Sequence, residues 1–439
     1  MNKPNSRGLL VFSAPLILAA LFEPLSGVVD TALVGQKQTH WLAALGLAAT
    51  LLSTFTWMFN FLIHASTQSI ASAGGRTEGA DSNLSLVKTS LLMTCVVASV
   101  TAVLLYFFKS PLYSFVGVAP DLSPVVDEYF LVRLAGHPII LLSLTTLSIL
   151  RGLKKVKQTL VLVILGTVLN GVLSFCALNF FDLGLSSVAM ATVFSHGIVF
   201  VIGMNLVLLT LKKSWIELFK VKASEVKSFA QKSWHLFGRS LILSSCFFLA
   251  TKFASVHGVT TLAAHQIALQ IWLLSSFITD GLAQGATILL SYEQARGKSV
   301  EYLRQLVWQS LGIALSIGVI FALILGAGES WWSALFTTDQ EVLSILKMVW
   351  PVLVWTQIYL AMTYVMDGVL MGLGQFRSMK WIMLSGTLVG FLPLGRLSLA
   401  PENYIYLWMG FALLGLWRLL VGGVWVQRYF RLLKLSSIG

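Results

Sequence analysis

Four acidic residues stand within long apolar stretches of the chain: Glu23, Asp30, Asp280 and Asp367. A carboxylate near the centre of a bilayer costs at least ~2.5 kcal/mol of insertion free energy, so each of the four needs a partner or a task there. Glu23 and Asp30 are seven residues apart, which is close to two helical turns, or about 10.5 Å along one helix face. Both carboxylates can therefore point into one cavity, where such a pair is suited to relay protons.

Two prolines lie in the same apolar stretch as this acidic pair. Pro15 and Pro24 each lack the backbone N–H that a helix needs, so the stretch should form a kinked or bendable helix. A bendable helix that carries Asp30 could switch the access to this acid. Glu23 also has a purely structural interpretation, because its carboxylate could bond the backbone groups that Pro24 leaves without a partner.

Further polar residues occur in two later apolar stretches of the first half. Asn170 lies in GTVLNGVLSFC, and Thr192 lies in SSVAMATVFSHG. Side chains of this kind either hold membrane helices together or line a cavity with Asp30, and the sequence leaves both interpretations open. Three histidines of this half are interpreted as hydrogen-bonded packing residues: His64, His137 and His196.

The second half carries a polar group of mixed charge in its apolar stretches. Lys252, Asp280 and Asp367 belong to three different stretches. An unpaired lysine in a membrane would be costly, so we expect Lys252 to form an ion pair with Asp367 or Asp280. The sequence leaves open whether this pair is structural or acts as a gate.

No motif for catalysis, nucleotide hydrolysis or metal binding accompanies these residues. The histidines and acids form no HExxH-like pair, and the sequence contains no GxxxxGK[ST] loop. None of the three cysteines has a CxxC neighbour or a histidine at the spacing of a metal site. We therefore expect a protein that is not an enzyme and holds neither a metal nor an organic cofactor. Any coupling to an energy source would come from an ion gradient, of H⁺ or, as the alternative, of Na⁺.

Membrane-spanning helices must position these residues. Hydrophobic residues make up 56% and charged residues 11% of the 439 residues, whereas an ordinary soluble domain has about 25% charged residues. A spanning helix needs about 20 mostly apolar residues.

The N-terminal run has no cleavage motif before Asp30 and should be retained as the first span. The expected fold is an all-α polytopic membrane protein in a lipid bilayer, with twelve runs at 8–35, 42–72, 88–108, 126–150, 158–180, 185–211, 232–256, 262–292, 304–328, 343–371, 378–395 and 404–427.

The net charge of +12 is distributed in a way that indicates membrane orientation and not nucleic-acid binding. If the N-terminus is cytoplasmic, Lys and Arg residues collect in the cytoplasmic loops. The opposite loops carry few of them and instead hold Asp121, Asp182, Glu329, Asp339, Glu341 and Glu402. The largest basic cluster lies between residues 212 and 232. This alternation predicts an even number of spans and places both termini in the cytoplasm.

A weak internal repeat indicates that the chain is duplicated. At a constant offset of 220 residues, Thr67 aligns with Thr287, and the segment 150–153 (LRGL) aligns with 370–373 (LMGL). One offset that serves two separated segments favours two six-helix bundles of the same topology. The expected domains are an N-terminal six-helix lobe, a cytoplasmic basic linker and a C-terminal six-helix lobe, at residues 1–211, 212–231 and 232–439.

The chain resembles the multidrug and toxic compound extrusion (MATE) family over nearly its whole length, and most closely the DinF-like branch. The resemblance rests on APLILAALFEPLSGVVDTALVG in the first span, LAAHQIALQIWLLSSFITDGLAQGAT in the eighth and MDGVLMGLGQ at the end of the tenth. LGTVLNGVLSFCALNFFDLGLSSVAMAT, across the fifth and sixth spans, resembles the family's paired Asn and Ala-Thr pattern. This resemblance implies two pseudo-symmetric six-helix lobes that form a V. It also implies a multidrug exporter that works by alternating access on small organic cations or amphipathic drugs.

The resemblance assigns roles to individual residues of the first half. Asp30 matches the first-helix carboxylate of the family. Many members carry an acid four residues after the asparagine that corresponds to Asn170, whereas this chain has Ser174 there. Glu23 is the candidate replacement for the missing acid. Three further positions match the hydrogen-bonded cavity partners and the bend point of the first helix: Asn170, Thr192 and Pro15.

A second departure from the family pattern bears on the coupling ion. Sodium-coupled members carry a carboxylate in the seventh span that works with one in the tenth. Asp367 fits the latter, but the segment SLILSSCFFLATKFAS of the seventh span offers only Lys252. This difference favours antiport against protons and leaves a sodium-coupled exporter as the alternative.

A flippase of lipid-linked saccharides, which shares the architecture of the wider superfamily, is a second alternative. A flippase should have a cavity rich in Arg and Lys, whereas the first-half spans offer mainly Arg133. The chain is expected to act as a monomer in a bacterial inner membrane and to bind no nucleic acid.

Overall fold

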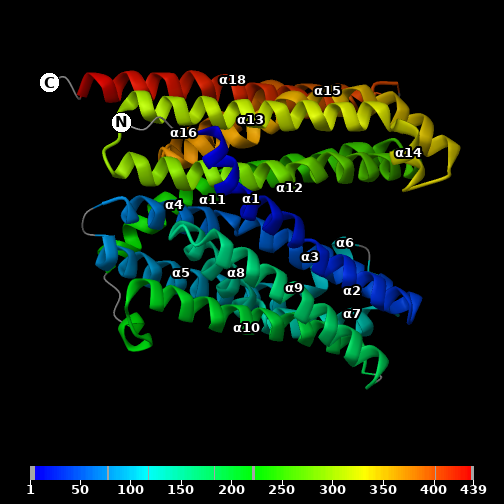
Figure 1. Ribbon diagram of the computed structural model, residues 1–439. Coiled ribbons are helices and arrows are strands. Elements are labelled where there is room, and N and C mark those ends of the chain that lie inside the picture. The colour runs from blue at the N-terminus through cyan, green and yellow to red at the C-terminus, as the bar shows by residue number, and fades with distance from the viewer. Residues whose placement is uncertain are drawn as a thin grey trace. The chain divides into compact units, whose positions relative to one another are not determined.

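The computed structural model consists of helices and the loops that join them (Figure 1). The residues that it describes contain no strand, so the predicted all-α fold is confirmed. In a bilayer the backbone polar groups must bond within their own segment, and a helix satisfies this requirement. The described residues are 5–76, 79–116, 118–181, 183–219, 223–400 and 402–436.

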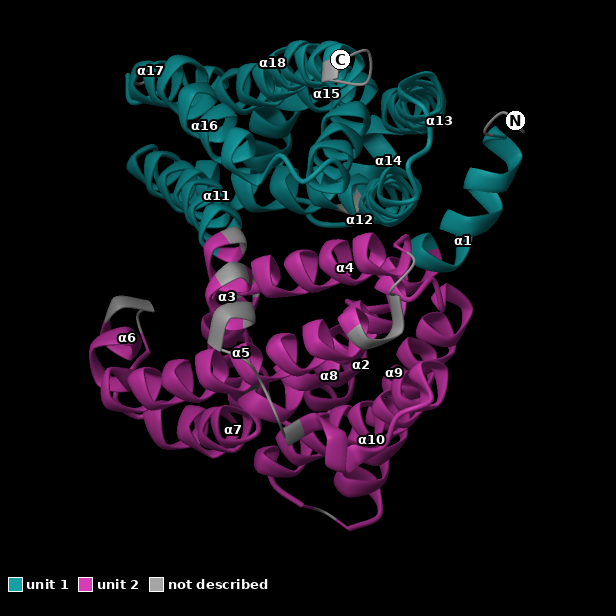
Figure 2. Ribbon diagram, turned by 90° about the vertical axis from the view of Figure 1, so that its left-hand side faces the viewer, with its two compact units in different colours: residues 1–17, 234–439 teal, residues 18–233 magenta. Residues whose placement is uncertain are grey.

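The chain divides into two compact units, which Figure 2 shows in magenta and teal. Unit 2 comprises residues 18–233, and unit 1 comprises residues 1–17 together with residues 234–439. The second boundary falls close to the end of the predicted linker 212–231. Residues 1–17, however, group with the C-terminal half of the chain and not with the predicted N-terminal lobe.

The first helix, α1 (Ser6–Phe22), contributes to both units. Unit 2 further contains α2 (Leu25–Gly35), α3 (Thr39–Met58), α4 (Asn60–Gly74), α5 (Gly79–Phe107), α6 (Lys109–Val116), α7 (Ser123–Ala135), α8 (His137–Gly152), α9 (Val156–Asn179), α10 (Leu185–Leu211) and the 3₁₀ helix η1 (Trp215–Phe219). Unit 1 contains most of α11 (Ala223–Val256) and all of α12 (Val259–Ala295), α13 (Val300–Ala327), α14 (Glu329–Ala334), α15 (Gln340–Gly372), α16 (Phe376–Gly386), the π-helical η2 (Thr387–Phe391), α17 (Leu392–Leu397) and α18 (Ile405–Ser436).

Two glycines of α12 explain why the beginning of α1 packs within unit 1. A Cβ atom added to Gly281 would lie 2.4 Å from Ile17 Cα, and one added to Gly285 would lie 2.1 Å from Ser13 Oγ. Such short distances mean that any larger residue would push the two helices apart. The missing side chains therefore let the backbone of α1 lie directly on α12.

Nine helices in the described residues are long and apolar enough to cross a membrane. A tenth span results if α7 and α8, which meet at a bend of 49°, count as one. The bend lies at Gly136, where an added Cβ would come within 2.1 Å of Val193 Cγ2. Each of these spans coincides with one of the twelve predicted runs.

The other two predicted runs are helical but interrupted. The run 42–72 is divided at Phe59, whose N–H bonds to the Thr56 carbonyl oxygen in a tighter turn. The run 378–395 contains the π-helical η2 before α17, where Pro393 cannot donate a backbone hydrogen bond. In the described residues the expected twelve spans therefore appear as ten spans and two broken helical runs.

The two units repeat the same interior contact at the predicted offset. In unit 2, Thr67 Oγ1 donates to the Ser148 carbonyl oxygen at 3.1 Å, and in unit 1, Thr287 Oγ1 donates to the Gly368 carbonyl oxygen at 2.8 Å. Both members of the second pair lie 220 residues after those of the first. The turn that follows is also repeated, because φ is positive both at Lys154 (63°) and, 220 residues later, at its counterpart glycine (73°).

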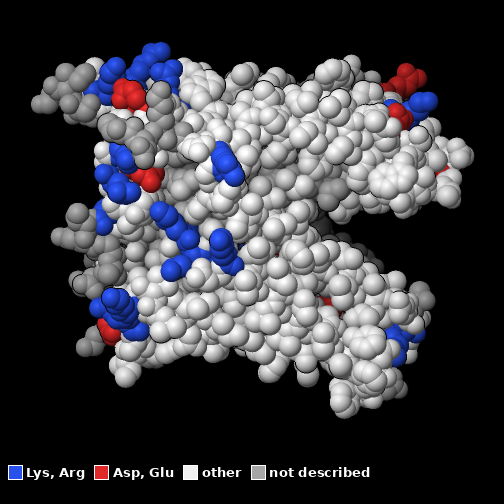
Figure 3. Space-filling model, viewed as in Figure 1, with Lys and Arg blue, Asp and Glu red and all other residues white. Residues whose placement is uncertain are grey.

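The helices expose large apolar side chains that water would not tolerate. Phe107, Leu209 and Val259 are 74%, 74% and 85% exposed. On the face that Figure 3 shows, most of the surface is uncharged, and Lys and Arg gather mainly near the ends of helices. Helices that cross a bilayer have this distribution, because their middle faces lipid and their ends face water. The chain is therefore a multi-pass membrane protein.

Candidate functional site

The first predicted span is interrupted at Glu23 and Pro24, between the end of α1 and the start of α2. Thr167 Oγ1 of α9 bonds the Phe22 carbonyl oxygen at this interruption, at 3.5 Å. Pro15, by contrast, lies within α1, which continues through it. Of the two predicted bend points, the interruption is thus found at Pro24, directly before the helix that carries the first-half acid.

Asp30 lies at the centre of a buried hydrogen-bond network formed by α2, α9 and α10. Its Oδ1 accepts a hydrogen bond of 2.9 Å from Ser174 Oγ, and its Oδ2 accepts a longer one of 3.5 Å from Thr192 Oγ1. Asp30 is only 4% exposed, and both of its partners are buried. Hydroxyl groups from two neighbouring helices thus replace water around this carboxylate.

Asn170 extends this network, because both the nitrogen and the oxygen of its side-chain amide form hydrogen bonds. Its Nδ2 donates to Thr192 Oγ1 at 3.1 Å, and its Oδ1 accepts from Ser26 Oγ at 2.8 Å. The structure therefore brings together four of the predicted site residues, Asp30, Asn170, Ser174 and Thr192. Ser26 was not predicted from the sequence, although its position could have indicated it: Ser26 lies four residues before Asp30, on the same face of α2.

Asp30 forms no ion pair in the described part of the chain, although a cation lies nearby. Arg133, in the last turn of α7, acts electrostatically on Asp30 without a hydrogen bond to it. Its guanidinium carbon lies 6.0 Å from the centre of the Tyr129 ring. Asp30 can thus change its charge without breaking a direct ion pair.

Glu23 lies apart from the network around Asp30. Its Oε1 accepts a hydrogen bond of 2.5 Å from Arg151 Nη2, at the end of α8. The Arg151 side chain is 6% exposed and the Glu23 side chain 42% exposed. The structure therefore places Glu23 beside a cation that links the interruption of the first span to α8, and not in an acid pair with Asp30.

In the second half, Asp367 is bound by two arginines. Arg239 of α11 and Arg418 of α18 both donate hydrogen bonds to its Oδ2. The three side chains are at most 11% exposed. Neither arginine was singled out from the sequence, although the rule that charged residues in apolar runs need partners applies to them as well.

The predicted ion pair of Lys252 with Asp367 is therefore wrong, because two arginines occupy that acid. Lys252 lies 13 residues after Arg239 on the same helix, or about 20 Å along its axis, at a different depth. Asp280 does not supply the pair either: its Oδ2 accepts a hydrogen bond of 2.8 Å from Gln284 Nε2, one turn along α12. In the described residues these three predicted residues do not form one cluster.

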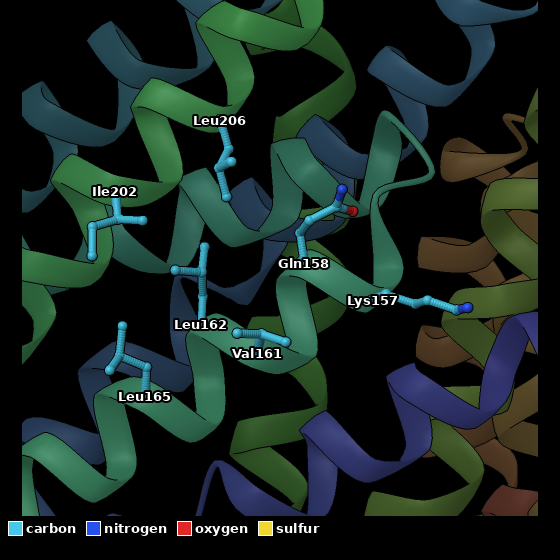
Figure 4. Close-up of a pocket in the computed structure, with 7 residues that line it drawn as sticks. All are labelled: Lys157, Gln158, Val161, Leu162, Leu165, Ile202 and Leu206. Atoms are coloured by element: carbon cyan, nitrogen blue, oxygen red, sulfur yellow. The ribbon is translucent and has the colours of Figure 1, made fainter.

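An apolar groove of about 330 Å³ lies between α9 and α10 (Figure 4). Leu162, Ile202 and Leu206 lie along it, and Lys157 at one end points away from them. Val161 is 63% exposed, so the groove belongs to the lipid-facing surface of these helices. None of the predicted site residues lines it.

Comparison with known proteins identifies the family. A sequence model of the MatE family matches residues 15–176 and 236–394. Protein DETOXIFICATION 44, a chloroplastic protein of Arabidopsis thaliana, is 29% identical over 95% of this chain and 81% of its own length. The probable multidrug resistance protein NorM of Photorhabdus laumondii is 25% identical over 100% of this chain and 97% of its own length. DNA damage-inducible protein F of Escherichia coli is 23% identical over 86% of this chain and 82% of its own length.

Solved structures confirm the fold. A crystal structure of a MATE transporter in the bent conformation superposes with a TM-score of 0.89 at 18% identity, over 99% of this chain and 98% of the other. The MATE transporter VcmN of Vibrio cholerae gives a TM-score of 0.86 at 19% identity, over 97% and 98%. The protein is a transporter and not an enzyme, as expected. The chain belongs to the MatE family of multidrug and toxic compound efflux transporters.

Proposed function

We propose that this chain expels amphipathic or cationic organic compounds in exchange for protons. In this proposal Asp30 binds the exported compound and the proton in turn. The observation that carries the proposal is a buried membrane carboxylate that, in the described residues, accepts hydrogen bonds from neutral side chains and forms no ion pair. Drug export is supported by the relative whose name describes a probable multidrug resistance protein.

Asp30 has the properties that such an exchange requires. Ser174 and Thr192 orient its carboxylate but leave its charge unneutralised, because both are uncharged donors. A proton or a cationic compound can each neutralise this charge, so the two compete for it. Competition for one group couples the outward movement of the compound to the inward movement of the proton.

The surroundings of Asp367 favour protons over sodium as the coupling ion. Two guanidinium groups, from Arg239 and Arg418, already bind this carboxylate. A sodium ion at Asp367 would meet their positive charges in a membrane interior, where repulsion is strong.

The interruption at Pro24 supports a switch between two arrangements of unit 2. A proton on Asp30 would weaken the charge-assisted hydrogen bonds from Ser174 and Thr192. α2 could then shift against α9 and α10, because the interruption uncouples it from α1. We infer alternating access on this basis. We further propose that the chain acts as a monomer in the inner membrane and that the distribution of Lys and Arg in its loops places both termini in the cytoplasm.

The proposal is tested by efflux of a fluorescent cationic dye from proteoliposomes under an imposed pH gradient, with sodium absent. We expect efflux that requires the gradient and that Asp30→Asn abolishes. Asp121→Asn, at an exposed site of the same unit, is the matched control and should leave efflux unchanged. Efflux that needs sodium would favour the sodium-coupled alternative. Movement of a lipid-linked saccharide without dye efflux would favour the flippase.

A further inference from the structure

Arg133 is a cation within the helices of unit 2 that has no hydrogen-bond partner in the described residues. Its Nε and Nη1 atoms are buried and unpartnered, whereas its third guanidinium nitrogen is not buried in this way. A buried donor without an acceptor costs about 1–3 kcal/mol, and more if it is charged. Arg133 therefore has the capacity to bind an acceptor that the described chain does not supply.

The groups on which the charge of Arg133 acts include one acid, Asp30, and two histidines. Arg133 acts electrostatically on Asp30 of α2, on His137 of α8 and on His196 of α10, so four helices surround its charge when its own α7 is counted. Tyr129 offers the face of its ring. The Nε2 atom of the buried His137 is likewise without a hydrogen-bond partner in the described residues.

Asp30 and Arg133 thus hold opposite charges in one helical bundle without neutralising each other by direct contact. This arrangement matches a compound that carries both a cationic and an anionic group. The planar guanidinium suits a carboxylate, which can accept two of its N–H groups. We propose that unit 2 binds zwitterionic organic compounds, with Arg133 as the binding group for their carboxylate and Asp30 as the binding group for their cationic end.

This inference rests on the proposed function, because it takes Asp30 as the site of the exported cation. It adds that exported compounds with a carboxylate bind more tightly than equivalent compounds without one. A proton on Asp30 would remove the partner of the cationic end, while Arg133 would still attract the carboxylate. Proton uptake would therefore weaken the binding of a zwitterion less than that of a simple cation.

A simpler role for Arg133 would be to balance the charge of Asp30. In that case its replacement would alter the binding of every cationic compound to the same extent. The zwitterion site predicts instead that the effect depends on the carboxylate of the ligand. A matched pair of ligands that differ only in this group separates the two roles.

Rhodamine B carries a cationic ring system and a carboxylate, and its ethyl ester keeps only the cationic charge. Their affinities for the full chain in detergent micelles are measured by fluorescence anisotropy, without any ion gradient. We expect Arg133→Gln to weaken the binding of rhodamine B by about tenfold, as for the loss of a charge-assisted hydrogen bond. The binding of the ester should change by less than about twofold.

Two further variants sharpen the test. Arg133→Lys keeps the charge but loses the planar fork, so the loss for rhodamine B should be intermediate. Arg76→Gln, at an exposed site of the same unit, should change neither affinity. The ratio of the two affinities is measured in one preparation, so a partly misfolded variant does not distort it.

An equal loss for both dyes in Arg133→Gln, or no loss for either, would overturn the zwitterion site. Because the measurement uses no gradient, the outcome does not depend on whether transport is coupled to protons. Failure of proton-driven efflux with an intact difference between the dyes would therefore count against the proposed function alone.

Discussion

Ser174 of α9 donates a hydrogen bond of 2.9 Å to the carboxylate of Asp30, although the two residues are 144 positions apart in the sequence. Both side chains are buried, so this contact fixes α2 against α9 inside unit 2. The family resemblance implies an acid at position 174 in many members. A hydroxyl at this point supports the charge of Asp30, whereas a second acid would repel it.

Loss of this hydroxyl should impair transport without unfolding the protein. We expect Ser174→Ala to lower the rate of pH-driven dye efflux by about tenfold, because a hydrogen bond to a charged group contributes about 1.5–3 kcal/mol. Ser53→Ala, at an exposed serine that bonds only its own helix at 3.1 Å, is the control. Unchanged efflux in Ser174→Ala would show that the Asp30 carboxylate does not depend on this donor.

Removal of the acid between two buried arginines should destabilise unit 1. Asp367→Asn leaves the guanidinium groups of Arg239 and Arg418 uncompensated, and we expect it to lower the free energy of unfolding by about 3–5 kcal/mol. Thermal unfolding in detergent checks this result. Replacing all three side chains by apolar ones should recover most of the loss. A stable Asp367→Asn protein would contradict the ion-pair assignment.

The pair of Glu23 and Arg151 should stabilise unit 2 cooperatively. A double-mutant cycle of Glu23→Gln and Arg151→Gln isolates their interaction from the other contacts of Arg151. We expect a coupling free energy of about 1 kcal/mol at most, because Glu23 is 42% exposed and water screens the pair. Fully additive effects on thermal stability would mean that the pair contributes nothing.

The close contact of α1 with α12 should make one glycine intolerant of a methyl group. Gly281→Ala places a Cβ atom 2.4 Å from the backbone of Ile17, so we expect a loss of about 1–3 kcal/mol in unfolding free energy. A Cβ atom added to Gly312, also within a helix, would meet no described residue within 4 Å outside its two chain neighbours and the backbone of its own helix. Gly312→Ala should therefore raise the stability by up to about 1 kcal/mol. Equal effects of the two substitutions would contradict the packing of α1 on α12.

The sequence was sufficient to predict the fold class and the core of the candidate site. Long apolar runs require helices in a bilayer, and the few polar residues within them have no other polar partners than each other. This reasoning, together with the family resemblance, selected Asp30, Asn170, Ser174 and Thr192. The structure joins these four residues by hydrogen bonds.

The partners of the remaining acids could not be predicted, for two physical reasons. The spacing of Glu23 and Asp30 indicates a shared face only on a continuous helix, and the helix is interrupted at Pro24 between them. The partners of Asp367 depend on tertiary packing, because Arg239 and Arg418 lie 128 and 51 positions away in the sequence. No local pattern relates residues at such separations.

The central claim is that a proton and an exported cation compete for Asp30. Proton release on binding tests it most directly: a cationic dye is added to the purified protein in weakly buffered, mildly acidic solution, and a pH indicator records the protons that appear. The account predicts release from the unaltered chain and from Asp121→Asn, and none from Asp30→Asn. Equal release from Asp30→Asn, or dye binding to the unaltered chain without any release, would contradict it.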